Sequence, residues 1–127
     1  MALSSTAQNR IVWGVRIFLA LAMGAAGTAK LASLPQMVEI FNHIGLGQWF
    51  RSFTGAVEVV GAVLLLVPAT GLLGALWVGG TMVGAVATHL FVIEGSPVAA
   101  MVLGLLCAFV VYQLRPGQQR RAGAVAV

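Results

Sequence analysis

Two side chains that can transfer protons, Glu58 and His89, and one ammonium group, Lys30, lie within or at the edges of long apolar segments. An ionisable group costs about 2.5–3.5 kcal/mol near the centre of a membrane span, so such groups face a bundle interior or a water-lined cavity. Glu58 or His89 could move a proton, and Lys30 could keep Glu58 ionised or stabilise an oxyanion. We therefore predict that Lys30, Glu58 and His89 form a catalytic trio between helices.

Lys30 belongs to a stripe of residues whose spacing is helical. The intervals between its members alternate between four and three, which keeps side chains on one face of a helix. The small middle and polar ends of the stripe indicate that it faces other helices and not lipid. Its members are Arg16, Ala20, Met23, Gly27 and Lys30.

Glu58 has a glycine three positions before it and another three positions after it, Gly55 and Gly61. Small neighbours allow another helix to approach the carboxylate closely. We therefore expect a polar site between helices near the outer leaflet. The residues expected to bind a substrate are Arg16, near the inner boundary, and Met23, Gly27, Thr81 and Thr88.

Each ionisable residue also has a purely structural interpretation, and the sequence leaves both open. Lys30 could extend its ammonium to the membrane surface, or it could fasten two helices through an ion pair with Glu58. His89 could hydrogen-bond a backbone carbonyl or Thr88 and do nothing more. Arg16 could reach the inner headgroups.

The composition identifies the solvent around these segments. Of the 127 residues, 60% are hydrophobic and 8% are charged, whereas soluble domains carry about 25% charged residues. A soluble domain of this length would leave about a third of its accessible area in water and could not bury so much apolar surface. We predict an all-α integral membrane protein, a four-helix bundle with a short interfacial amphipathic helix between its first two spans.

The charge and cysteine content exclude several classes of function. Seven Lys and Arg and three Asp and Glu give a net charge of +4, which is too little basic charge for a nucleic-acid interface. The one cysteine, Cys107, lies in an apolar run, so the chain has no disulfide framework, CxxC pair or zinc-binding spacing. A dithiol redox mechanism carried by this chain alone is therefore excluded, and no metal site is expected.

The helices that must position these side chains follow from the hydropathy pattern. About 20 consecutive apolar residues are needed to cross the hydrocarbon core of a bilayer. Residues 1–10 are expected to form a short mobile arm, and residues 115–127 a flexible basic tail. The four spans are expected over about residues 11–31, 50–67, 72–93 and 97–114.

The segment between the first two spans is amphipathic. Pro35 can begin a helix there, because its missing N–H is not needed in the first turn. Apolar residues then recur at helical spacing, whereas Glu39, Asn42 and His43 fall largely on the other side. We predict a helix over residues 35–44 that lies at the membrane surface.

Basic residues outside the first and last spans predict the orientation. The positive-inside rule places both termini in the cytoplasm, and the chain is expected to be a multi-pass protein of the cell inner membrane. In that orientation the three groups of the trio all lie near the outer boundary, where we expect them to converge. The basic residues are Arg10, Arg115, Arg120 and Arg121.

Two segments resemble the DoxX and DoxX-like family of small membrane proteins. One runs from Arg16-Ile-Phe-Leu to Ala26-Gly27-Thr28-Ala29-Lys30-Leu31 and resembles the family's first helix. The other, Gly55-Ala-Val-Glu58-Val-Val-Gly61-Ala-Val-Leu64-Leu-Leu, resembles its second-helix pattern of Gly-x-x-Glu followed by Gly and leucines. The resemblance implies a four-helix bundle and draws attention to Arg16, Lys30 and Glu58.

The resemblance also implies functions. Members of that family are connected with thiosulfate:quinone oxidoreduction, with thiol and oxidative-stress defence, and with membrane-bound oxidoreductase complexes. Distant eukaryotic relatives act as assembly chaperones for receptors. We therefore expect a membrane subunit of a quinone- or thiol-linked oxidoreductase or oxidative-stress system, with a quinone as its non-covalent cofactor.

Two other functions stay open, and with them the question of whether the chain is an enzyme. It could be a non-enzymatic membrane anchor or assembly protein, in which the buried charges only fix helix pairing. It could also be a cofactor-independent isomerase or epoxide-opening enzyme that uses the trio on an apolar substrate. The expected partners are the lipid bilayer, an apolar or quinone-like small molecule, a soluble redox partner and further copies of the chain, but no nucleic acid.

Overall fold

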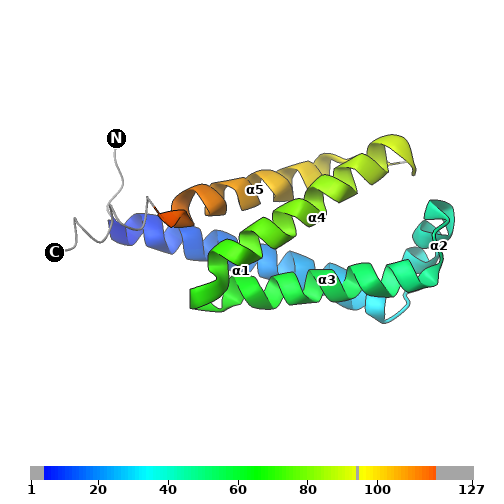
Figure 1. Ribbon diagram of the computed structural model, residues 1–127, viewed down its shortest axis with the longest axis horizontal. Coiled ribbons are helices and arrows are strands. Elements are labelled where there is room, and N and C mark those ends of the chain that lie inside the picture. Colours follow the sequence, from blue (N-terminus) through cyan, green and yellow to red (C-terminus); the bar gives the residue numbers. More distant parts are fainter. Residues whose placement is uncertain (1–4, 94, 117–127) are drawn as a thin grey trace.

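The computed structural model describes residues 5–93 and 95–116, and the predicted all-helical fold is confirmed for that part of the chain. The long helices form two antiparallel pairs, because α1 packs mainly on α3 and α4 packs mainly on α5 (Figure 1). The elements are α1 (Ser5–Leu31), α2 (Pro35–Ile44), α3 (Gln48–Leu66), the 3₁₀ helix η1 (Pro68–Thr70), α4 (Gly71–Phe91) and α5 (Val98–Leu114).

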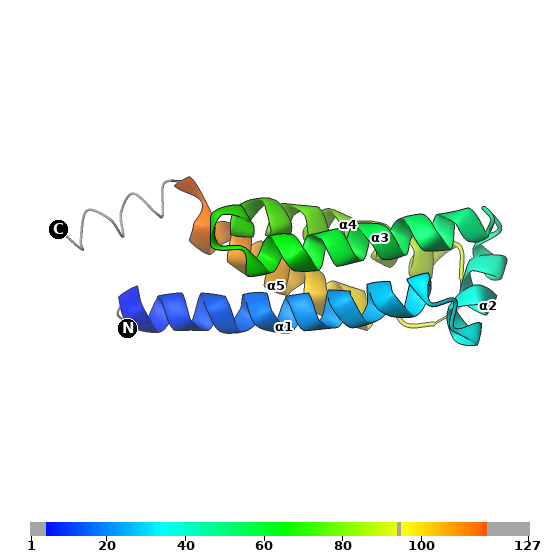
Figure 2. The same ribbon diagram turned by 90° about the horizontal axis from the view of Figure 1, so that it is seen from below.

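The bundle has two distinct ends. α1 begins and α5 ends at the same end, where η1 also lies, and α2 lies across the other end (Figure 1, Figure 2). We call these the η1 end (η1, Pro68–Thr70) and the α2 end (α2, Pro35–Ile44). Figure 2 also shows that α1 and α3 run side by side along most of their length.

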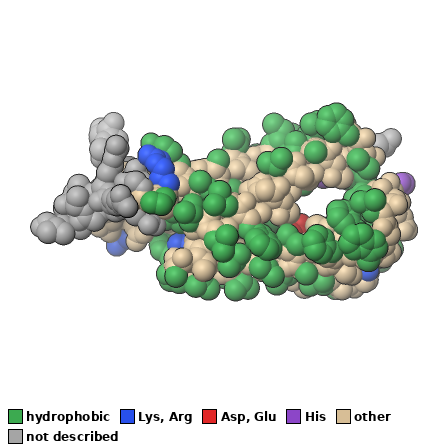
Figure 3. Space-filling model, in the orientation of Figure 1, with side chains coloured by type: hydrophobic (Ala, Val, Ile, Leu, Met, Phe, Trp, Pro, Cys, Tyr) green, Lys and Arg blue, Asp and Glu red, His purple; other side chains and the backbone are tan. Residues whose placement is uncertain are grey.

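Within the described residues, three segments are long and apolar enough to cross a membrane: Ser5–Leu31, Gln48–Leu66 and Pro68–Phe91. α5 is also apolar but shorter, at 17 residues. Large hydrophobic side chains are spread over the face of the bundle seen in Figure 3. Exposed residues of this kind include Leu21, at 69%, and Leu105, at 71%. This outward apolar surface indicates contact with the lipid bilayer, so the chain is a multi-pass membrane protein.

The predicted helix over residues 35–44 has the observed bounds of α2, Pro35–Ile44. α1 begins at Ser5, before the predicted span, because nothing between Ser5 and Arg10 is a helix-breaking Gly or Pro. Part of the expected N-terminal arm is therefore helical. Residues 1–4 of that arm, and residues 117–127 of the expected tail with Arg120 and Arg121, lie outside the described residues.

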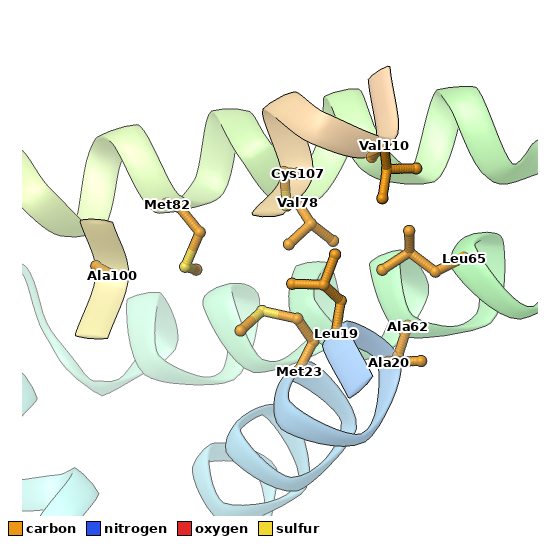
Figure 4. Close-up of a cluster of buried hydrophobic side chains, with 11 residues drawn as sticks. Leu19, Ala20, Met23, Ala62, Leu65, Val78, Met82, Ala100, Cys107 and Val110 are labelled. Carbon is orange, nitrogen blue, oxygen red and sulfur yellow. The ribbon is translucent and has the colours of Figure 1, made fainter. Parts of the chain in front are cut away.

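A cluster of buried side chains joins the two pairs in the middle of the bundle (Figure 4). Leu19 of α1 and Leu65 of α3 are completely buried in it, as is Val110 of α5. Cys107 is 1% exposed and packs in the same cluster. The other members are Ala20, Met23, Ala62, Ala75, Val78, Met82 and Ala100.

Glycines allow α3 and α4 to approach closely. A Cβ atom at Gly61 would lie 2.6 Å from Cγ2 of Val78, and one at Gly74 would lie 2.8 Å from the backbone nitrogen of Leu65. Only residues without a side chain fit such a contact. Near the same crossing, the indole Nε1 of Trp77 donates a hydrogen bond to the carbonyl of Val57 at 2.9 Å.

α4 leaves α3 beyond this crossing. Its last buried residue is Met82, although the helix continues to Phe91. The two helices diverge toward the α2 end (Figure 1), and the space-filling view shows an opening there between the outer part of α4 and the α2–α3 side (Figure 3). An acidic side chain is visible at the inner end of the opening.

Candidate functional site

Lys30 and Glu58 form an ion pair between α1 and α3. The ammonium Nζ of Lys30 donates to both carboxylate oxygens of Glu58, at 3.0 Å to Oε1 and 2.9 Å to Oε2. The two side chains are 14% and 6% exposed. The pairing that the sequence allowed is therefore confirmed, and both charges are compensated within the bundle.

A glycine contact brings these two charges together. A Cβ at Gly27 would lie 2.7 Å from the carbonyl oxygen of Gly55 and 3.1 Å from Cβ of Glu58. A Cβ at Gly55 would lie 2.9 Å from the carbonyl oxygen of Gly27 and 3.0 Å from Cβ of Lys30. Each glycine thus sits against the charged residue of the other helix, and the ion pair depends on this close crossing.

Arg51 is a third buried charge at the same crossing, 8% exposed. Its Nη1 donates to the carbonyl of Lys30, and its Nε donates to Oε1 of Gln48 at 2.7 Å. Nε2 of Gln48 in turn donates to Oδ1 of Asn42 at 2.8 Å and to the carbonyl of Val38 at 3.1 Å. A continuous polar network therefore runs from α2 to the ion pair.

The sequence-based prediction did not include Arg51 or Gln48 among the site residues. The spacing could have identified Arg51, because it precedes Gly55 by four and Glu58 by seven positions and so shares their helical face. No comparable pattern identifies Gln48, because two of its partners, Val38 and Asn42, lie on a separate short helix.

His89 does not join the pair, which corrects the expected convergence of three groups. Its Nδ1 donates to the carbonyl of Ala85 at 2.9 Å, within α4 itself. No hydrogen bond or ion pair links it to Lys30 or Glu58 in residues 5–93 and 95–116. The hydrogen bond from Trp77 to Val57 places Trp77 at the level of Glu58. His89 lies 12 residues beyond Trp77 on α4, which is about 18 Å along the helix axis at 1.5 Å per residue.

Arg16 lies at the η1 end, far from the ion pair. Its Nε donates to the carbonyl of Leu65 at 2.8 Å and its Nη2 to that of Val67 at 2.9 Å. The guanidinium stacks 3.8 Å from the ring centre of Trp13 and is 3% exposed. Arg16 therefore binds the C-terminal carbonyls of α3. It neither reaches toward headgroups nor lines a site with Lys30, because the two are 14 residues apart on one helix, about 21 Å.

The other residues expected to bind a substrate are divided among different places. Gly27 lies beside Glu58, and Met23 is 3% exposed in the central cluster. Thr81 donates its hydroxyl to the carbonyl of Trp77 at 3.0 Å, and Thr88 donates to that of Gly84 at 2.8 Å. Both hydroxyls thus hydrogen-bond backbone carbonyls of their own helix, α4. Of these four residues, only Gly27 contacts the ion pair.

The ion pair has hydrogen-bonding capacity beyond its own two contacts. An ammonium has three N–H donors, and the bonds to Glu58 use two of them. A ligand carbonyl or oxyanion could accept the third. Among residues 5–93 and 95–116, no three His, Cys, Asp or Glu side chains gather as the ligands of a metal ion would. The chemistry that this site offers is therefore hydrogen bonding and proton exchange at a carboxylate–ammonium pair.

Comparison with known proteins places the chain in a family. The model of the family described as DoxX-like matches residues 14–112, which include every residue of the ion pair and of the polar network. The chain is also 28% identical over 100 residues to the uncharacterized protein YdgD of Bacillus subtilis (strain 168), covering 76% of this chain and 87% of that protein. No solved structure matches it.

Proposed function

Since the chain belongs to the DoxX-like family, we propose that it is a membrane subunit of a quinone- or thiol-linked oxidoreductase or oxidative-stress system. The observation that carries the proposal is the Lys30–Glu58 ion pair, a carboxylate and an ammonium held together between two apolar helices of the bundle. Charges at such a depth are costly, and in membrane proteins they mark sites of ligand or proton handling.

The residues fit the headgroup of a quinone. The remaining donor of Lys30 would hydrogen-bond a quinone carbonyl, and Glu58 would accept or return a proton at that position. The opening at the α2 end gives an apolar tail a path from the bilayer, since exposed hydrophobic residues such as Leu90 and Phe53 lie on the helices that border it. A bound quinone would supply the two-electron redox chemistry, and a soluble partner would exchange the electrons.

We further propose that α2 lies on the outer side of the membrane and that both termini are cytoplasmic. The support is the placement of Arg10 and Arg115 at the η1 end, where α1 begins and α5 ends. The Lys30–Glu58 site then lies in the outer half of the bilayer.

A second candidate function is that of a membrane anchor or assembly protein without its own chemistry. One observation favours it: Arg16, Lys30, Arg51 and Glu58 all have hydrogen-bond partners within the chain. Charges that are paired in this way need no further role than to specify which helices pack together. The binding experiment described next distinguishes the two candidate functions.

The experiment measures binding of a short-chain quinone analogue to the purified protein in lipid nanodiscs, by native mass spectrometry and by quenching of tryptophan fluorescence. Glu58→Gln and Lys30→Met should each weaken binding about tenfold or more, because a hydrogen bond to a charged group contributes about 1.5–3 kcal/mol. The matched control is Glu39→Gln, the same chemical change on the exposed face of α2. Unchanged binding in Glu58→Gln, or no binding by the wild type, would favour the anchor.

A further inference from the structure

We infer, building on the proposed function, that Gln48 and Arg51 are positioning residues that couple the surface helix α2 to the Lys30–Glu58 pair. Binding of a ligand to the pair, or a rearrangement of the pair, would then change the stability with which α2 is held against the bundle. A displacement of α2 would in turn change the geometry of the Lys30–Glu58 contact. The support is a series of hydrogen bonds that runs from α2 through Gln48 and Arg51 to the backbone carbonyl of Lys30, whose side chain forms the pair.

α2 has few other contacts that fix its position. Phe41 is its one buried side chain, and its ring lies 5.8 Å from that of Phe50. The chain on either side of α2 leaves helical geometry, with φ of 58° at Ser33 and 82° at Gly45. α2 is therefore a separate short element whose placement depends on Phe41 and on hydrogen bonds.

Gln48 supplies those hydrogen bonds. It is the first residue of α3, and its side-chain amide bonds the carbonyl of Val38 and the side chain of Asn42, both on α2. Its carbonyl oxygen accepts from Nε of Arg51, which orients the amide. An alanine at position 48 would remove all three bonds and leave α2 attached through Phe41.

Arg51 carries the connection into the bundle. Its guanidinium donates to the carbonyl of Lys30 in the last turn of α1 and thereby fixes the backbone from which the Lys30 side chain reaches Glu58. Arg51 and Glu58 lie two turns apart on one buried face of α3. The network is thus contiguous, and coupling through such a network acts equally in both directions.

Hydrogen–deuterium exchange of the full chain in nanodiscs tests this without any ligand. Glu58→Gln should accelerate exchange of the amides in residues 35–44 by about fivefold, the lower end of typical coupling between sites, although α2 does not contact Glu58. Glu39→Gln, an equal change on α2 but outside the network, should leave that exchange unchanged. Equal exchange in the wild type and Glu58→Gln would overturn the inference.

A second pair of variants covers the case in which Glu58→Gln does not fold. Arg51→Lys keeps the charge but loses the forked geometry, and Gln48→Ala breaks the link to α2. Both should accelerate exchange in residues 35–44 by about fivefold and leave residues 60–66 of α3 unchanged. Acceleration in both regions would indicate general loss of stability and would contradict the coupling.

The outcome is independent of quinone binding. If α2 responds to Glu58→Gln but no quinone analogue binds, the coupling stands and the proposed function fails. If the analogue binds through Glu58 and α2 does not respond, the function stands and Gln48 and Arg51 lose their positioning role.

Discussion

Gly27 and Gly55 face each other where α1 crosses α3, and each precedes one member of the ion pair by three residues. A Cβ atom added to either glycine would lie within 3 Å of the backbone carbonyl oxygen of the other. Lys30 and Glu58 therefore meet because their helices touch at backbone distance. Small residues at a helix crossing are the usual way to obtain this approach in a membrane.

The first prediction concerns this crossing. Gly27→Ala should destabilise the protein by about 1–3 kcal/mol, because the new methyl group would overlap the α3 backbone and force the helices apart. The measurement is thermal unfolding in mild detergent. Gly14→Ala on the same helix is the control, since a Cβ there meets nothing within 4 Å, and it should change stability by less than about 1 kcal/mol. Equal effects of the two substitutions would show that the crossing tolerates a side chain.

The second prediction concerns the energetic coupling of the ion pair. Lys30→Met or Glu58→Met alone should each cost about 3–5 kcal/mol, because each leaves one buried charge without its partner. The double variant should recover most of that loss, since two apolar side chains need no compensation. A double-mutant cycle by denaturant unfolding measures the coupling. Additive losses in the double variant would mean that the pair does not act as a unit.

The third prediction concerns Arg16 at the η1 end. Arg16→Met should cost about 2–3 kcal/mol, because the carbonyls of Leu65 and Val67 lose charged donors. Gly71→Ala should act through the same interaction, since a Cβ at Gly71 would lie 2.5 Å from Cζ of Arg16. Unfolding of the single and double variants tests this. The loss of stability caused by Gly71→Ala should largely disappear when Arg16→Met is already present. An equal loss of stability with and without Arg16→Met would contradict the prediction.

The fourth prediction concerns the proposed orientation. In a Cys107→Ser background, Asn42→Cys should react with a membrane-impermeant maleimide in intact cells, because α2 is placed outside. Ala69→Cys, in η1, should react only after permeabilisation, because η1 lies at the opposite end of the bundle. Both positions are exposed, so a difference in labelling reports the side of the membrane. The reverse pattern would place the Lys30–Glu58 site in the inner half of the bilayer.

The sequence was sufficient for features that depend on local patterns. Pro35 and the apolar spacing after it predicted both bounds of α2, and the glycines on either side of Glu58 predicted that another helix approaches it closely. Counting residues along antiparallel helices also predicted that Glu58 and Lys30 lie at the same level of the bundle.

It was not sufficient for features that depend on helix direction and on backbone acceptors. His89 was placed beside Glu58 by depth alone, but α4 diverges from α3 after Met82 and carries His89 away. Arg16 and Arg51 each donate to a carbonyl group at the end of a neighbouring helix. Every residue carries a carbonyl, so no pattern of side chains distinguishes those that accept a charged donor.

The short α5 has a consequence for the surrounding lipid. Its 17 residues span about 26 Å, whereas the hydrocarbon core of an average bilayer is about 30 Å thick. We therefore expect that, where α5 crosses the bilayer, the bilayer thins locally along it or Pro97 and Arg115 are drawn toward the hydrocarbon boundary. Either adjustment costs free energy in proportion to the hydrophobic mismatch, so membranes with short acyl chains should suit this protein better than thick, sterol-rich ones.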